Sequence, residues 1–118
     1  MKIGSIVIKC RKFDDMLAFW QKTLHYVPKA PPQGGWVILR DPEGGGPNIS
    51  LDRVPDEERL GSAKHPRLHL DLYAANREIE VMRLIKIGAK RHRQTYGPED
   101  DFRVLEDPDG NLFCVVQN

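Results

Sequence analysis

The sequence predicts an α+β fold made of two βαβββ modules in a pseudo-twofold arrangement. Residues 36–44 (WVILRDPEG) return in altered form as residues 102–110 (FRVLEDPDG), and both copies end in an Asp-Pro-acid-Gly turn. The strand-like residues 5–8 have a counterpart at 69–72. Because a solenoid needs about three or more repeats, we expect the two copies to share one core. This predicts a cupped, mostly antiparallel, eight-stranded sheet with the helices on its outer face.

The length and composition fit one domain spanning residues 1–118. We expect module one at 1–54, a polar linker at 55–66 and module two at 67–118. The net charge of +1 gives no overall field that attracts nucleic acid or an anionic membrane. No apolar stretch reaches membrane-spanning length, and the two cysteines come without a secretion signal. We therefore expect a cytoplasmic protein with reduced thiols that binds neither nucleic acid nor membranes.

Module one is expected to hold one helix, between Asp14 and Leu24. Its apolar residues recur at three- and four-residue steps and are Phe13, Met16, Leu17, Trp20 and Leu24. Pro28 restricts the strand after the helix to a short edge position. The other strands expected in this module span residues 2–9, 36–40 and 48–54.

Module two follows the same order, with a helix between Asn76 and Gly88. Asn76 is a good N-cap because its side chain accepts a backbone hydrogen bond, and Gly88 is a favourable C-terminal stop. The strands expected in this module span residues 67–73, 90–95, 102–106 and 112–117. The turn at residues 96–98 (Tyr-Gly-Pro) separates the second of these strands from the third.

Side chains alternate between the two faces of a strand, which sorts the candidate residues. The residues expected beneath the helices are Ile6, Ile8, Ile49, Leu51, Leu68, Leu70, Leu72, Phe113 and Val115. Those expected on the opposite, concave face are Ser5, Val7, Asn48, Ser50, Asp52, His69, Asp71, Tyr73, Leu112, Cys114 and Val116. The resulting cavity mixes polar and apolar walls, which is typical of small-molecule sites.

Several segments resemble the vicinal oxygen chelate superfamily, the glyoxalase and bleomycin-resistance group, and the resemblance covers the whole chain. Its strongest parts are residues 67–72 (RLHLDL), 86–89 (KIGA) and 107–114 (DPDGNLFC), together with Phe19, Trp20 and Leu24. The Asn-x-Phe-Cys ending is similar to a glyoxalase-like subgroup in which it replaces a glutamate. The resemblance implies a single glyoxalase-like domain that binds a small molecule in the sheet cavity and forms a homodimer.

The resemblance also implies where a divalent metal lies in the metal-dependent members. Carried over by position, the ligands are Ser5, Ser50 (or Asp52 after a one-residue register change), His69 and Cys114. Serine hydroxyls are poor ligands, and His69 with Cys114 forms neither a tetrahedral zinc site nor a two-His-one-carboxylate iron site. We therefore expect no metal cofactor. If a divalent metal binds to this degenerate set, His69 and Asp52 are its expected ligands.

The first functional hypothesis is a protein that binds a small organic molecule without a conventional metal site. Its expected ligand-binding residues are Ser5, Trp36, Ser50, Asp52, His69, Asp71 and Cys114. The alternative is a metal-dependent lyase, isomerase or dioxygenase that uses His69 with Asp52 or Asp71. A third hypothesis is a metal-free acid–base enzyme with His69 and Asp71 as catalytic residues, since histidine titrates near neutral pH.

Some candidates have a structural interpretation beside the functional one. His69 and Asp71 also suit a buried polar pair that fixes strand register. Trp36 and Phe102 occupy equivalent positions, where they either line the cavity or plug the core. Cys114 is expected to be an inert thiol, since no helix start or basic residue adjoins it. The histidines expected at the surface are His25, His65 and His92.

Overall fold

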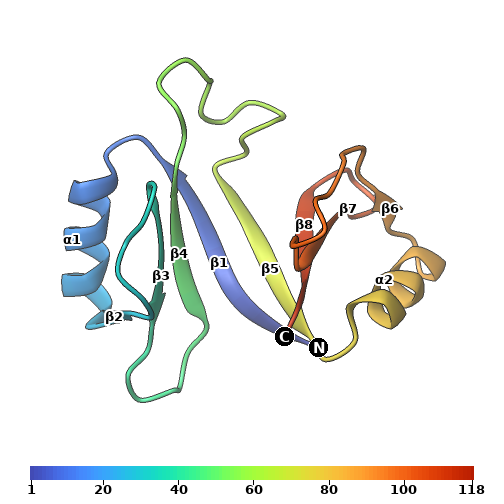
Figure 1. Ribbon diagram of the computed structural model, residues 1–118, viewed down its shortest axis with the longest axis horizontal. Helices are drawn as coiled ribbons and strands as arrows, with labels where there is room; N and C mark the ends of the chain where they lie inside the picture. Colours follow the sequence, from blue (N-terminus) through green and yellow to red (C-terminus); the bar gives the residue numbers. More distant parts are fainter. The chain divides into compact units, whose positions relative to one another are not determined.

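The computed structural model describes residues 1–118 and has the predicted element order, βαβββ followed by βαβββ (Figure 1). The fold is α+β, with an eight-stranded, mostly antiparallel open sheet and two helices. The strands are β1 (Lys2–Cys10), β2 (Val27–Pro28), β3 (Trp36–Arg40), β4 (Asn48–Arg53), β5 (Leu68–Ala74), β6 (Lys90–Arg91), β7 (Phe102–Glu106) and β8 (Leu112–Gln117). The helices are α1 (Phe13–Leu24) and α2 (Arg77–Lys86).

The chain divides into two compact units. We call Ser5–Leu68 the N-terminal unit, and Met1–Gly4 together with His69–Asn118 the C-terminal unit. The module and linker boundaries expected from the sequence stay a prediction.

In the N-terminal unit the strand order is β2-β3-β4-β1, and α1 packs against β4. β3 is antiparallel to β2 and β4, whereas β1 and β4 are parallel and are joined by a crossover that includes α1. The buried core residues are Val37, Leu39, Ile49 and Leu51. The residues packed around them include Ile6, Ile8, Phe13, Met16, Leu17 and Trp20. The predicted placement of these apolar residues between helix and sheet is therefore confirmed.

Local sequence features explain where α1 begins and ends. Asp14 and Asp15 lie in its first turn, where carboxylates stabilise the positive end of the helix dipole. His25 follows the helix in a left-handed conformation, with φ of 58°, which stops further helical hydrogen bonding. Pro28 then limits β2 to two residues, as predicted for a short edge strand.

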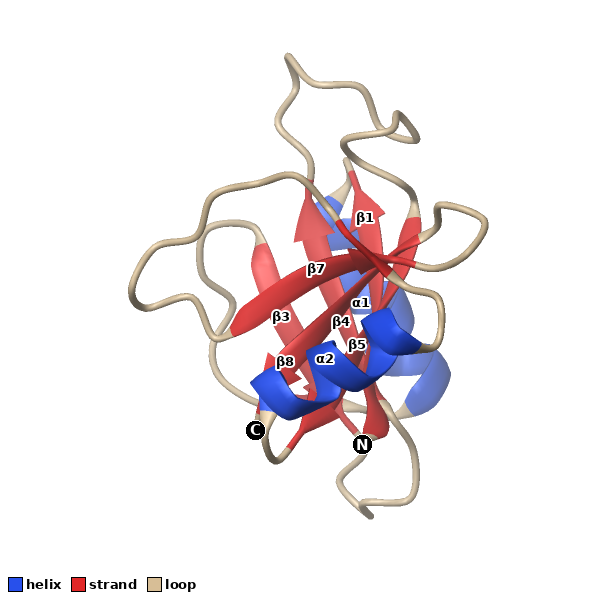
Figure 2. Ribbon diagram, turned by 90° about the vertical axis from the view of Figure 1, so that its right-hand side faces the viewer, coloured by secondary structure: helices blue, strands red, loops and turns tan.

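In the C-terminal unit the strand order is β5-β8-β7-β6, and Figure 2 shows α2 in front of these strands. β5 and β8 are parallel, whereas β7 is antiparallel to both β8 and β6. The helix packs against β7 and β8. The buried core residues are Ala74, Val81, Leu105 and Val115, and Phe113 packs against them. The predicted placement of Phe113 and Val115 on the helix side is confirmed.

The predicted ends of α2 are also confirmed. Asn76 caps the helix, and its Oδ1 accepts a hydrogen bond of 3.2 Å from the backbone N–H of Ile79. Gly88 follows with φ of 126°, a conformation that side-chain-bearing residues rarely adopt. A second glycine explains how the start of β1 fits this unit. A Cβ atom on Gly4 would overlap the ring of Tyr73 in β5, so only glycine allows this approach.

The repeated Asp-Pro turns close in the same way in both units. The Asp41 carboxylate accepts hydrogen bonds from the backbone N–H groups two and four residues later, both at 2.9 Å. Asp107 does the same at 3.0 and 2.9 Å. Hydrogen bonds from the Asn111 side chain and from backbone N–H groups hold the pKa of Asp107 below the ordinary value of an aspartate. The repeated sequence is thus a turn that is stabilised by the carboxylate of its own first residue.

The strand predicted over residues 90–95 is shorter than expected, because β6 contains only Lys90–Arg91. The backbone N–H of His92 still donates to the carbonyl of Val104 at 3.1 Å. The N–H of Val104, however, donates to the phenol oxygen of Tyr96 at 2.9 Å. Because the N–H of Val104 already donates to Tyr96, it is not available to pair with a longer β6. The chain therefore leaves the sheet after His92.

The prediction that Leu68 and Leu70 lie covered beneath a helix is wrong. These side chains are 60% and 38% exposed. α2 begins just after β5 and packs against Ala74, at the end of that strand, and against β8. The alternation of faces along β5 holds, but the helix does not reach the beginning of the strand.

Neither helix is long and apolar enough to cross a membrane. Apolar side chains on or after α2 are exposed, namely Ile79, Met82 and Ile87. The homodimer and the cytoplasmic location stay predictions.

Truncating Leu105 should destabilise the protein far more than truncating Leu70. Leu105 is completely buried against α2, so Leu105→Ala should lower the free energy of unfolding by about 2–5 kcal/mol. Leu70 points to the same side of the sheet but is 38% exposed, so Leu70→Ala should cost less than about 1.5 kcal/mol. Urea denaturation of both variants measures the difference. Equal losses would contradict the coverage of the sheet described above.

Candidate functional site

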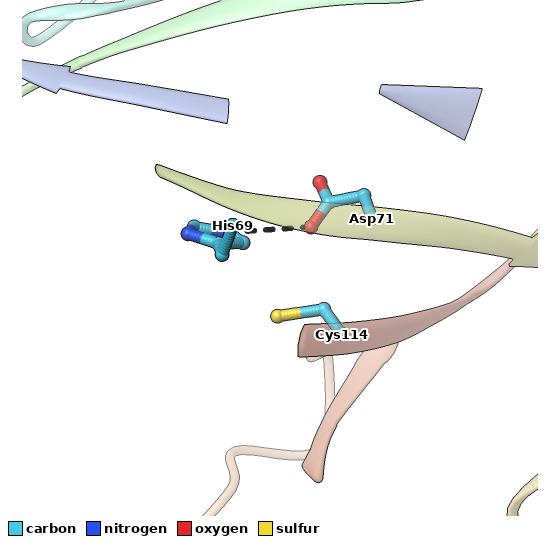
Figure 3. Close-up of side chains that lie close together, drawn as sticks. All are labelled: His69, Asp71 and Cys114. Atoms are coloured by element: carbon cyan, nitrogen blue, oxygen red, sulfur yellow. Dashed lines mark ion pairs between the residues drawn. The ribbon is translucent and has the colours of Figure 1, made fainter. Parts of the chain in front are cut away.

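Three polar side chains lie together on the face of the C-terminal unit opposite α2. β5 carries His69 and Asp71, and the strand register places Cys114 of β8 directly beside Asp71. Because Phe113 and Val115 pack toward α2, the intervening Cys114 faces away from the helix. Figure 3 shows the His69 ring, the Asp71 carboxylate and the Cys114 sulfur gathered beside the two strands. We call these three residues the β5–β8 cluster.

The three groups of the β5–β8 cluster are close enough to contact one small ligand. One potential ligand atom from each residue lies within 4.8 Å of the others. His69 Nε2 is 3.4 Å from Asp71 Oδ1, longer than an ordinary N–H···O bond of about 2.7–3.2 Å. The two side chains are 15% and 16% exposed, so both remain accessible. The cluster therefore offers a hydrogen-bond donor, an acceptor and a soft sulfur atom within a few ångströms.

Apolar side chains continue this face across β8 and β7. Val104 lies opposite Cys114, and Phe102 lies opposite Val116 in the antiparallel register. Leu105, the residue after Val104, is buried against α2. Because side chains alternate along a strand, Val104 and Phe102 therefore face away from the helix. The result is a polar cluster beside a partly exposed apolar surface, a combination typical of small-molecule sites.

The other predicted site residues lie in the N-terminal unit, on the face opposite α1. Ser5 and Ser50 are fully buried, and their hydroxyl oxygens share a hydrogen bond of 2.6 Å. Asp52 forms an ion pair with Lys9, with 2.6 Å between Oδ2 and Nζ. Trp36 pairs with Asp52 in the strand register and is 37% exposed, so it is not buried in the core. That these four residues share one site with the β5–β8 cluster stays a prediction.

The sequence matches the glyoxalase-like domain family over residues 5–116, nearly the whole chain. The chain belongs to this family. The resemblance to the vicinal oxygen chelate superfamily is thereby confirmed. A search of curated proteins found no match.

Solved structures share the fold of this glyoxalase-like domain at low sequence identity. A hypothetical protein from Bacillus halodurans has a TM-score of 0.70 and 16% identity, over 99% of this chain and 94% of that one. A glyoxalase/bleomycin resistance protein/dioxygenase superfamily member from Vibrio splendidus has a TM-score of 0.61 and 16% identity, over 97% of each chain. Methylmalonyl-CoA epimerase from Mycobacterium tuberculosis has a TM-score of 0.68 and 16% identity, over 98% of this chain and 87% of that one. At these identities the likeness is one of fold.

The residues of this glyoxalase-like domain do not fit the four-ligand metal site that the superfamily resemblance implies. Ser5 and Ser50 are neutral hydroxyls bonded to each other, and neither is an ordinary ligand for a divalent metal. The carboxylate of Asp52, the alternative ligand, is bound to the ammonium group of Lys9. In the N-terminal unit, the implied positions therefore supply no ligand that is ready to bind a metal.

The two cysteines of the domain differ in their surroundings and do not form a disulfide with each other. Cys10 is only 4% exposed, and burial, followed by the negative charge of Asp52, raises the pKa of its thiol. Cys114 is partly exposed and lies in the β5–β8 cluster. Cys114 is therefore the thiol that a bound molecule on this face would meet.

The C-terminal unit contains a second histidine–carboxylate pair, which the sequence analysis missed. His92 Nδ1 lies 3.2 Å from Glu106 Oε2, and both side chains are about one-third exposed, at 34% and 32%. Alternation along residues 102–106 already places Glu106 on the face opposite α2. The sequence predicts a strand that includes His92, but it does not show that this strand pairs with β7 in the register that brings His92 to Glu106. Its backbone bond to Val104 brings it there.

Proposed function

We propose that this glyoxalase-like protein binds a small organic molecule on the face of β5, β8 and β7 opposite α2. The observation that carries the proposal is the β5–β8 cluster, in which His69, Asp71 and Cys114 converge within 4.8 Å. Each of the three is partly exposed. This site supports the proposal and the fold alone does not, since one fold hosts proteins with different activities.

The cluster and its surroundings supply the two kinds of contact that a small ligand needs. The His69 ring and the Asp71 carboxylate offer a donor and an acceptor to one polar group of the ligand. Val104 and Val116 offer apolar surface to the remainder, whose burial contributes about 25 cal/mol per Å². Such contacts need no metal ion, and the occupied serine and aspartate groups of the N-terminal unit support binding without one.

Replacing His69 should weaken binding of a simple probe without unfolding the protein. Benzamide suits the test because its amide both donates and accepts hydrogen bonds and its ring is apolar. His69→Ala should weaken benzamide binding about tenfold, the loss expected for one or two hydrogen bonds in a partly exposed site. Ligand-observed NMR measures the affinity, and thermal unfolding measures the stability.

Leu70→Ala is the matched control, because Leu70 is the next residue along β5 and points to the opposite face. It should leave benzamide binding unchanged. Equal losses of binding in the two variants would mean that the His69 face is not the binding surface.

The second candidate function is a metal-dependent lyase, isomerase or dioxygenase. The observation that favours it is again the β5–β8 cluster, because imidazole, carboxylate and thiolate are all ligands of transition metals. Three protein ligands and one open position form the usual arrangement of catalytic zinc. This ligand set differs from the one that the superfamily resemblance implies, since Asp71 takes part and the N-terminal unit does not.

Metal analysis of protein purified without chelators separates the two candidates. The metal-free proposal predicts well below one transition-metal ion per chain, because the implied positions of the N-terminal unit offer two hydroxyls bonded to each other and a carboxylate bound to Lys9. About one zinc, iron, manganese or nickel ion per chain would contradict it. In that case Cys114→Ser should release the metal, whereas Cys10→Ser, which removes the buried thiol, should not.

A further inference from the structure

The second histidine–carboxylate pair, His92 with Glu106, lies on the same face of the C-terminal unit as the β5–β8 cluster. Leu105 is buried against α2, so its neighbours Val104 and Glu106 point to the opposite side of β7. The imidazole of His92 must lie on that side too, because its Nδ1 is 3.2 Å from the Glu106 carboxylate. One face of the C-terminal unit therefore carries two such pairs.

The strand register sets the separation of the two pairs. β8 lies between β5, which carries His69 and Asp71, and β7, which carries Glu106. Neighbouring strands are about 5 Å apart, so the backbone of Glu106 lies about 10 Å across the sheet from the strand that carries His69 and Asp71. The side chains between them are apolar or weakly polar, namely Leu112, Cys114 and Val104. A molecule that contacts both pairs must therefore be elongated and apolar in its middle.

The charges on this face indicate which end groups it accepts. Asp71 and Glu106 contribute two carboxylates, one at each side of the apolar strip. Lys90 is opposite Glu106 in the strand register, but its side chain is exposed to solvent. The face thus carries one more acidic than basic side chain when the histidines are neutral. Two carboxylates oppose a molecule with an anionic group at each end and favour hydrogen-bond donors or cations.

We propose that His92 and Glu106 form a second ligand anchor, and that this face takes an elongated small molecule with a cationic or hydrogen-bond-donating group at each end. This inference rests on the proposed function, because the first end group occupies the His69–Asp71 pair. It assigns a binding role to two residues outside the expected site, and it defines the ligand by length and charge.

Hexamethylenediamine and hexylamine test the second anchor, because they share a six-carbon chain and differ in one terminal amine. Side-chain NMR signals of the four histidines report where each amine binds. The diamine should shift the signals of His69 and His92 together, with one dissociation constant, and should bind about tenfold more tightly than hexylamine. His25, at the end of α1, and His65, beside Glu58, are internal controls whose signals should not move.

Glu106→Gln should abolish the advantage of the diamine over hexylamine. The matched control is Glu43→Gln, which removes the same charge from an exposed turn of the N-terminal unit. If Glu106→Gln does not fold, as judged by the loss of dispersed backbone NMR signals, His92→Gln is used in its place and should give the same result. Equal affinity for both amines in the unaltered protein, no binding of either amine, or a shift of the His69 signal alone would overturn the second anchor.

Failure of the second anchor is distinguishable from failure of the proposed function. If the diamine has no advantage but benzamide binding still depends on His69, the second anchor is wrong and the first remains. If benzamide binding is also insensitive to His69→Ala, both are wrong.

Discussion

The pairing register of β5 and β8, with α2 covering one face, is the constraint on which the candidate site depends. Once Asp71 is paired with Cys114, alternation leaves both residues on the face away from the helix, together with His69. Burial of Val115 and Leu105 beneath α2 fixes this orientation, because a one-residue slip would carry these apolar side chains to the other face. The same register places Val104 and Glu106 on the site face. A purely structural constraint therefore selects which polar residues meet.

The two units use the faces opposite their helices differently. In the N-terminal unit the polar groups satisfy one another, as Ser5 does with Ser50 and Lys9 with Asp52. In the C-terminal unit the His69–Asp71 contact is longer than an ordinary hydrogen bond, and both side chains stay accessible. Polar groups joined by a short hydrogen bond or ion pair satisfy one another, whereas the loosely paired groups of the C-terminal unit keep hydrogen-bonding capacity for a ligand. This difference supports the C-terminal unit as the location of the proposed binding site.

Much of the fold follows from local rules that the sequence displays. The Asp-Pro turns, the Asn76 cap and the alternation along β8 need only neighbouring residues, and all are as predicted. The errors arise where distant parts of the chain decide the outcome. The exposure of Leu70 depends on how far α2 extends over β5, and the end of β6 depends on the Tyr96 phenol, which binds the N–H of Val104. Pairing of His92 with Glu106 depends on the register of residues 90–92 against β7, which the sequence does not show.

An engineered disulfide tests the register and facing of the site most directly. Asp71→Cys places a thiol on the register partner of Cys114, within the Cα separation of about 4.4–6.8 Å that disulfides require. Leu72→Cys is the control, because Leu72 is paired with Val115 and points toward the α2 side. After mild oxidation, mass spectrometry of alkylated protein should find Cys10 as the one reduced cysteine of Asp71→Cys, and all three cysteines reduced in Leu72→Cys. A disulfide to Cys114 in Leu72→Cys, or none in Asp71→Cys, would contradict the arrangement of the β5–β8 cluster.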